Sequence, residues 1–257
     1  LSLSEVESVY PSHFPTKALN LTNFGSTTLK NVKKPSAIQG SIGSNVAFSI
    51  DDYNHCRVYG AGRTYDYTSS TNSPIYQYKD QVFTAVIEPG PTYLGKYLFY
   101  NLVHLQSITI PATVTQLGTH VFYQCSSLQT IDIPNSITAL PANVFRYCSS
   151  LQSVNLPNTL TTIGSDAFAS CLQLSSITIP NSVTTIDTYA FYSCYALETI
   201  VIPNSVTSLG GNVFRFCSSL REITISNRVT TINARLLADC PNLTKVTFEG
   251  SLNSIYS

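Results

Sequence analysis

The chain of 257 residues has little charge and no methionine. Only 11% of its side chains are charged, 14 basic against 14 acidic, so no net charge remains at pH 7. Without a basic surplus there is little charge to neutralise phosphates, which argues against nucleic acid as a partner. No run approaches the roughly 18 to 20 apolar residues that span a bilayer, so we expect no direct membrane insertion by this segment. Because the chain begins at Leu1 and has no methionine, we expect the natural start and any signal peptide to lie outside it.

The sequence also lacks the patterns of catalytic sites. Four histidines, His13, His55, His104 and His120, stand in unrelated contexts, and no cysteine has a histidine at a fixed spacing. Carboxylates are sparse and do not pair on one face, and there is no glycine-rich phosphate loop. We therefore expect a protein that is not an enzyme and needs no cofactor.

Cysteine, in contrast, recurs with a strict period. Six of the seven cysteines follow one another at steps of 23 residues, and phenylalanine recurs at the same step. The two columns are Cys125, Cys148, Cys171, Cys194, Cys217 and Cys240, and Phe122, Phe145, Phe168, Phe191 and Phe214. Self-similarity at a period of this length predicts a solenoid of stacked coils.

The cysteine column is predicted to be a structural ladder. Equivalent residues of stacked parallel coils lie about 4.8 Å apart and point the same way, whereas a disulfide needs β-carbons about 3.8 Å apart. Zinc is the alternative, but single stacked cysteines lack the CxxC pairing that brings four ligands around one ion. We expect buried, reduced thiols and no metal.

One unit, residues 128–148, shows how a coil is built. The alternation around Ile131 and Ile133 predicts a strand with one buried face, and Pro134 ends it because proline has no N–H for a β-ladder. A second corner is marked by glycine in several copies, at Gly118, Gly164 and Gly210. The Phe-x-x-Cys segment is predicted to make the third side as a helical or 3₁₀ turn.

Three segments are expected along the chain. Residues 1–39 are rich in Ser, Thr, Asn, Lys and Pro, which predicts a linker or the tail of a preceding module. Residues 40–81 are predicted to form a β-hairpin cap, with strands at 46–50 and 57–59 around a turn. Residues 82–257 are predicted to form about eight coils, the last incomplete, so we expect the natural chain to continue past Ser257 or to be capped there, because an open solenoid end is an unpaired strand edge.

The repeat resembles the BspA-like, or TpLRR-type, leucine-rich repeats. The segment from Ile179 to Ile186, followed by Ala190-Phe191 and Cys194, matches the pattern LxxIxIPxSVTxIxxxAFxxC, and the likeness covers residues ~82–257. The resemblance implies a right-handed leucine-rich repeat solenoid with a parallel β-sheet on its concave face and a small N-terminal β cap. The cap departs from the family in having Phe48 where a tryptophan is usual.

Two surfaces are candidates for binding. On the concave sheet we expect outward columns that hold Thr109, Asp132, Asn155, Thr178, Val201, Glu222, Thr224 and Lys245. The alternative is that Thr and Ser simply suit solvated strand positions. The residues that depart from this hydroxyl-rich composition are Asp132, Val201, Glu222 and Lys245. On the opposite side aromatic residues cluster, either as an interface or packed between turns: Tyr100, Tyr123, Tyr147, Tyr192 and Phe216.

The resemblance implies a cell-surface or secreted adhesion protein that binds host, matrix or cell-surface proteins or glycoproteins. The alternative is an intracellular structural solenoid, associated laterally or end to end within a larger assembly. Two sequons, at Asn20 and Asn242, become N-glycosylation sites if the chain enters a secretory pathway.

Overall fold

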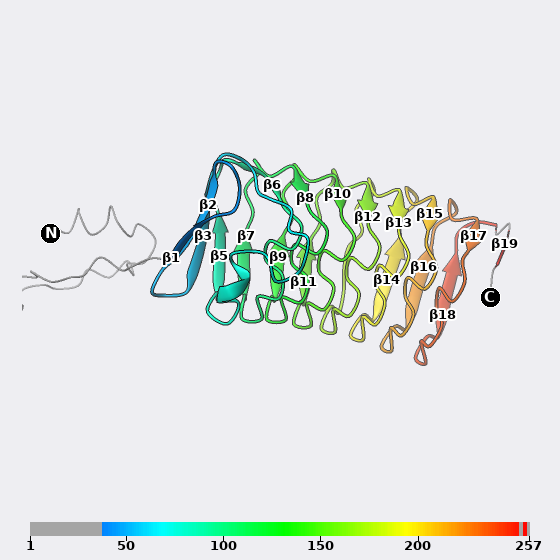
Figure 1. Cartoon of the computed structure of the whole chain (residues 1–257). Coiled ribbons are helices and arrows are strands. Elements are labelled where there is room, and N and C mark those ends of the chain that lie inside the picture. The colour runs from blue at the N-terminus through cyan, green and yellow to red at the C-terminus, as the bar shows by residue number, and fades with distance from the viewer. Residues whose placement is uncertain (1–37, 252–253, 256–257) are drawn as a thin grey trace, which may run out of the picture. The chain divides into compact units, whose positions relative to one another are not determined.

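The fold was analysed in a computed structural model that describes residues 38–251 and the backbone of residues 254–255. The linker expected over residues 1–39 lies, except for its last two residues, outside the described residues, and so does Asn20. The described chain forms a parallel β-solenoid with an N-terminal sheet, as the sequence predicts (Figure 1).

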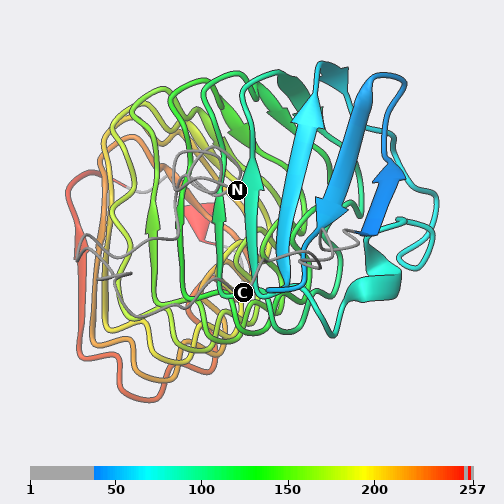
Figure 2. The same ribbon diagram turned by 90° about the vertical axis from the view of Figure 1, so that its left-hand side faces the viewer.

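The N-terminal sheet is made of three antiparallel strands, β1 (Ile38–Ser41), β2 (Val46–Ile50) and β3 (His55–Gly60). Phe48 of β2 pairs with Val58 of β3, and both side chains are buried. Strand β3 then runs parallel to β5 (Thr84–Ile87), which pairs with β7 (Ser107–Thr109). The expected cap therefore closes the ladder of the first coils, and the figures show its strands beside theirs (Figures 1 and 2).

The same side of the solenoid continues with β9 (Thr130–Asp132), β11 (Ser153–Asn155), β14 (Thr199–Ile202), β16 (Glu222–Ile225) and β18 (Lys245–Phe248). Paired residues are 23 apart, as in Asp132 with Asn155 and Glu222 with Lys245. This side is divided into three separate ladders, because β7 and β9 are not paired with each other and residues 174–180 carry no strand. Within this stretch Ile177 is only half-buried, unlike Ile131 and Ile200 at equivalent positions.

A second row of short parallel strands lies at the next corner of each coil (Figure 1). It comprises β4 (Gly62–Arg63), β6 (Pro91–Leu94), β8 (Gln116–Leu117), β10 (Ala139–Leu140), β12 (Thr162–Ile163), β13 (Thr185–Ile186), β15 (Ser208–Leu209), β17 (Thr231–Ile232) and β19 (Ser254–Ile255). A 3₁₀ helix, η2 (Tyr76–Tyr78), lies before the first coil.

The core between these rows is a column of stacked phenylalanine rings. Phe99, Phe122, Phe145, Phe168, Phe191 and Phe214 are fully buried. Successive ring centroids are 5.3 to 5.6 Å apart with nearly parallel planes. Each coil thus covers the apolar face of its neighbour, which is the interaction that stabilises a solenoid.

The third side of each coil is not the helical or 3₁₀ turn that the sequence predicts. Two non-glycine residues per coil, four apart, adopt the left-handed conformation, for example Asn143 with φ 61° and Tyr147 with φ 63°. Because of these left-handed residues, every second N–H group of the turn points along the solenoid axis toward the next coil. The amides of Asn143, Phe145 and Tyr147 each donate a 2.9 Å hydrogen bond to the next coil. These turns are therefore tied to the next coil by backbone hydrogen bonds, which a helical turn would have used internally.

Candidate functional site

The candidate site on the sheet side, which we call the sheet face, consists of the outward side chains of two adjacent columns. One column holds Ser107, Thr130, Ser153, Ser176, Thr199, Glu222 and Lys245, and the other holds Thr109, Asp132, Asn155, Thr178, Val201, Thr224 and Thr247. Twelve of these 14 side chains are exposed, while Thr224 and Thr247 are half-buried. The structure therefore brings together every residue that the sequence assigns to this face, except that Thr178 lies in the stretch without a strand.

Val201 stands out on the sheet face because it is 62% exposed, the largest exposure of any valine in the described residues. Its partner across the ladder is Thr224, and the equivalent residue of the coil before is Thr178, so both carry a hydroxyl. A β-branched apolar side chain surrounded by hydroxyls gives the face one apolar point, where contact with a partner would release water.

The charged residues of the face are already engaged with their neighbours. The Asn155 amide donates a hydrogen bond to the Asp132 carboxylate. Lys245 Nζ lies 3.1 Å from the Glu222 carboxylate, and both side chains remain more than half exposed. Exposed pairs of this kind contribute little to the free energy of unfolding. A binding partner can therefore replace these contacts with its own at a small cost in free energy.

The cysteine ladder lies inside the solenoid and does not reach either surface. All seven cysteines are free thiols, and only Cys240 is less than fully buried. Burial raises the pKa of Cys125 and of Cys194 to about 12, because a thiolate would lose its hydration. Within the described residues no group of three or more His, Cys, Asp or Glu side chains could hold a metal ion. The six buried thiols are consequently protonated and unreactive.

The turns of the third side form a second surface, which we call the turn ridge. In each coil it consists of the outward side chains from the end of the short second-row strand to the residue after the cysteine. Tyr100 and Tyr123 stack at 5.2 Å and are half-buried, so these expected aromatics pack between coils. Tyr147, Tyr189 and Tyr195 are exposed by 38%, 37% and 47%. Sequence reasoning missed Tyr189 and Tyr195; the signal was available, because Tyr195 interrupts a column that holds serine at 126, 149 and 218.

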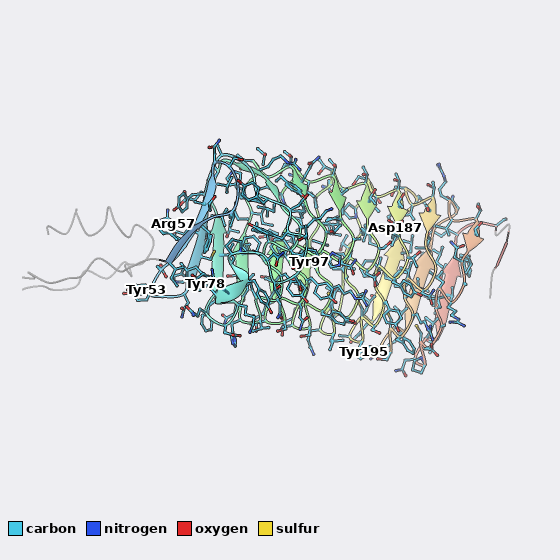
Figure 3. All side chains as sticks on the ribbon, viewed as in Figure 1. Tyr53, Arg57, Tyr78, Tyr97, Asp187 and Tyr195 are labelled. Atoms are coloured by element: carbon cyan, nitrogen blue, oxygen red, sulfur yellow. The ribbon has the colours of Figure 1, made fainter. Side chains whose placement is uncertain are left out.

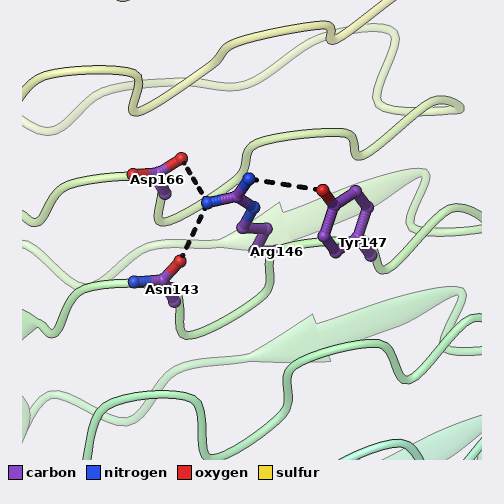
Figure 4. A network of polar contacts seen from close by, with 4 residues as sticks. All are labelled: Asn143, Arg146, Tyr147 and Asp166. Atoms are coloured by element: carbon purple, nitrogen blue, oxygen red, sulfur yellow. Dashed lines mark hydrogen bonds and ion pairs between the residues drawn. The ribbon is translucent and has the colours of Figure 1, made fainter.

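A polar network supports the ridge around Arg146 (Figure 4). Its guanidinium lies 2.9 Å from the Asp166 carboxylate and 3.3 Å from the Tyr147 hydroxyl. Burial raises the pKa of the Asp166 carboxyl, and the charge of Arg146 opposes that shift. The guanidinium thus links Asn143 and Tyr147 of its own coil to Asp166 of the next coil.

His120 packs beside this network, and its ring contacts are with aromatic side chains. Its ring stacks on Tyr97 at 4.7 Å, and Nδ1 is buried with no hydrogen-bond partner among the described residues. Burial, and then the charge of Arg146, lower its pKa, so the ring is neutral at pH 7. The ring contacts Tyr97 and Tyr123, and this aromatic stacking accounts for its position.

Asn242 of the second sequon is exposed on the last described coils, and its amide nitrogen donates a 2.7 Å hydrogen bond to the carbonyl of Ser218. The part of the chain that the structure describes has no helix with the length and hydropathy of a membrane span.

Comparison with known proteins identifies the repeat. A family model described as the BspA type leucine rich repeat region matches in six copies, over residues 70–198 and 139–257. No curated protein matches the chain. Solved structures similar to the chain include the leucine-rich repeat protein TpLRR of T. pallidum, with 22% identity, a TM-score of 0.49 and 81% of both chains covered. A leucine-rich repeat protein from Bacteroides ovatus is 21% identical, with a TM-score of 0.48, over 82% of this chain and 77% of that one. A leucine rich cell surface protein from Faecalibacterium prausnitzii is 18% identical, with a TM-score of 0.34, over 86% of this chain and 97% of that one.

Proposed function

Because the chain belongs to the BspA-type leucine-rich repeat family, we propose that it is a non-catalytic binding module, exposed on a cell surface or secreted, that recognises host, matrix or cell-surface proteins through the sheet face. The family consists of repeat solenoids, whose extended surfaces serve binding. The class of partner is inferred from family membership. The binding surface is inferred from the geometry of the sheet face.

The observation that carries the proposal is the exposure of the two outward columns. Their side chains stand in register, coil after coil, at the spacing of a parallel ladder, about 4.8 Å. The exposed apolar area at Val201 lies in the coil before Glu222, which pairs with Lys245 of the coil after it. Interfaces combine an apolar centre with a polar rim in this way.

The experiment measures binding of the whole chain to a panel of purified, immobilised extracellular-matrix proteins by surface plasmon resonance. For any protein that binds, Asp132→Asn and the double exchange Glu222→Lys with Lys245→Glu should weaken binding about tenfold or more. The double exchange keeps an ion pair while reversing its direction, so the fold is retained.

Matched controls come from the threonines of the same columns. Thr130→Ala and Thr178→Ala should change the affinity less than about twofold, because these hydroxyls are solvated strand positions. If the charge variants behave like the threonine variants, the sheet face is not the binding surface. If no matrix protein binds, the proposed partner class is wrong.

A second candidate function is an intracellular structural solenoid docked in a larger assembly. Seven free cysteines without a disulfide favour it, because thiols remain reduced in intracellular compartments. Labelling of unpermeabilised cells with a membrane-impermeant reagent distinguishes the two: labelled protein supports the surface module, and protein labelled only after permeabilisation supports the scaffold. A glycosidase-sensitive mass on the peptide that contains Asn242 would also support the surface module.

A further inference from the structure

The turn ridge contains a hollow that the repeat itself does not require. The hollow has a volume of ≈ 480 Å³ and is shallow and open to solvent. It is lined by Gln124, Ser126, Tyr147, Ser149, Ser170, Leu172 and Tyr195. A smaller hollow of ≈ 300 Å³ lies beside the stacked aromatics and Arg146, and its lining includes that charged residue.

Its origin is a change of side-chain size in one column. The second left-handed position of successive coils is occupied by Gln124, Tyr147, Ser170, Ser193 and Phe216, with φ between 57° and 63° in all five. Since Tyr147 and Phe216 adopt the same backbone as Ser170, the position accepts a large ring. Serine at 170 is therefore what leaves the hollow open.

Two exposed tyrosines stand at its two sides. Tyr147 belongs to the coil before Ser170, and Tyr195 belongs to the coil after it; they are 38% and 47% exposed. Tyr195 lies at the outer margin of the coils, away from the corner that carries Asp187 (Figure 3). Tyrosine supplies a rigid, amphipathic contact surface at low entropic cost, so two of them beside a hollow form an anchor site.

The lining is uncharged but rich in hydrogen-bond donors. No Lys, Arg, Asp or Glu lines the hollow, which matches a neutral occupant. Ser126 and Ser149 donate to backbone carbonyls of the preceding coils. The side chains of Gln124, Ser170 and Tyr195, by contrast, make no hydrogen bond to any residue that the structure describes. These three donors face a ligand that offers acceptors.

The hollow extends over four successive coils, because its lining runs from Gln124 to Tyr195. An extended, neutral segment with free acceptors matches this lining. A polyproline II helix makes no internal hydrogen bonds, so its carbonyls are free acceptors, and the side chains of its prolines are neutral and apolar.

We propose that the hollow between Tyr147 and Tyr195 is a docking site for a proline-rich segment of a partner protein in the polyproline II conformation. Prolines of this segment pack against the two tyrosine rings, and Gln124, Ser170 and the Tyr195 hydroxyl donate to its carbonyls. Proline-rich segments bind aromatic-lined grooves in this manner because the ligand is ordered before it binds. The inference shares with the proposed function the premise of a protein partner, but it concerns a different surface.

The test uses the whole chain and fluorescein-labelled decaproline, with binding followed by fluorescence anisotropy and a Gly-Ser peptide of equal length as the control ligand. Saturable binding of decaproline alone is expected. Tyr195→Ala and Tyr147→Ala should each weaken it about tenfold or more. Tyr189→Ala is the matched control, because Tyr189 is 37% exposed on the same ridge but does not line the hollow, and it should change the affinity less than about twofold.

A filling variant separates the hollow from the tyrosines. Ser170→Tyr should abolish binding while the unfolding midpoint is retained, because Tyr147 already adopts that backbone conformation. The inference is overturned if decaproline does not bind saturably, if Tyr189→Ala weakens binding as much as Tyr195→Ala, or if Ser170→Tyr binds normally. It is also overturned if maltohexaose or cellohexaose binds with the same tyrosine dependence and decaproline does not.

The sheet-face variants keep the two proposals apart. The double exchange Glu222→Lys with Lys245→Glu should leave decaproline binding unchanged. Decaproline binding without any matrix-protein binding would support this inference and contradict the proposed function; the reverse result would do the opposite.

Discussion

The sulfur of Cys148 lies 3.1 Å from the carbonyl oxygen of Phe122 in the preceding coil. The same carbonyl accepts the N–H of Cys125 in its own coil, at 3.3 Å. Both lone pairs of a buried carbonyl are thereby used, one within the coil and one between coils. Every cysteine of the ladder makes the same contact to the phenylalanine 26 residues before it, from Cys125 to Cys240.

The first prediction concerns that contact. Cys148→Ala should lower the free energy of unfolding by about 2 kcal/mol, because it removes the sulfur from a closed core and leaves half of the carbonyl's capacity unused. Cys148→Val keeps the volume but not the donor, and should cost about 1 kcal/mol. Urea denaturation of both variants checks this, and a stability unchanged by Cys148→Val would mean that the thiol acts by volume alone.

The second prediction concerns thiol accessibility. Cys240 is half-buried, whereas Cys56 and the other five ladder cysteines are buried. With iodoacetamide under native conditions, Cys240 should be alkylated first and the others only on unfolding. Peptide mass spectrometry of a time course reports the order. Early labelling of Cys148 or Cys171 would contradict the closed core.

The third prediction is a loss of stability in alkaline solution. Burial raises the pKa of Cys56, Cys125 and Cys194 from an ordinary value near 9.0 to about 12 in the folded state. Between pH 9 and pH 12 the unfolded chain has released these protons and the folded chain has kept them. The free energy of unfolding should therefore be constant below pH 9 and fall above it, by up to about 1.4 kcal/mol per pH unit and thiol. Urea titrations at pH 8 and pH 10 measure the fall, and a rise would contradict the buried thiols.

The fourth prediction compares two ion pairs of the turn ridge. Arg146 pairs with Asp166, whose side chain is only 19% exposed, while Arg215 pairs with Asp239, which is 47% exposed. Arg146→Ala should cost about 1 to 2 kcal/mol and raise the pKa of Asp166 further, since a half-buried carboxylate loses its partner. Arg215→Ala should cost about 0.5 kcal/mol or less. Thermal unfolding of both variants decides, and equal costs would contradict the difference in burial.

The period of 23 residues was sufficient to predict the solenoid and the columns of the sheet face, because stacked copies must align equivalent residues. The cap strands followed from the alternation at 46–50 and the turn after it. The left-handed turns were not predictable, since Asn143 and Tyr147 are not glycine and the inter-coil hydrogen bonds that compensate their backbone cost appear only when coils stack. The interruption at residues 174–180 left no mark in the alternation of Ile177 and Ile179. The small side chain of Ser170, between larger residues at equivalent positions such as Tyr147 and Phe216, can be read from the sequence. That it leaves a hollow follows only once the structure shows this position on the surface.

The most direct test of the sheet face as the binding surface is the affinity of Val201→Asp for a matrix protein that binds the unaltered chain. Val201 is 62% exposed, so its substitution should change the free energy of unfolding by about 0.5 kcal/mol or less. An increase in Kd of about tenfold or more, with an unchanged unfolding midpoint, is the predicted result. An unchanged Kd would contradict the account and place recognition on another surface.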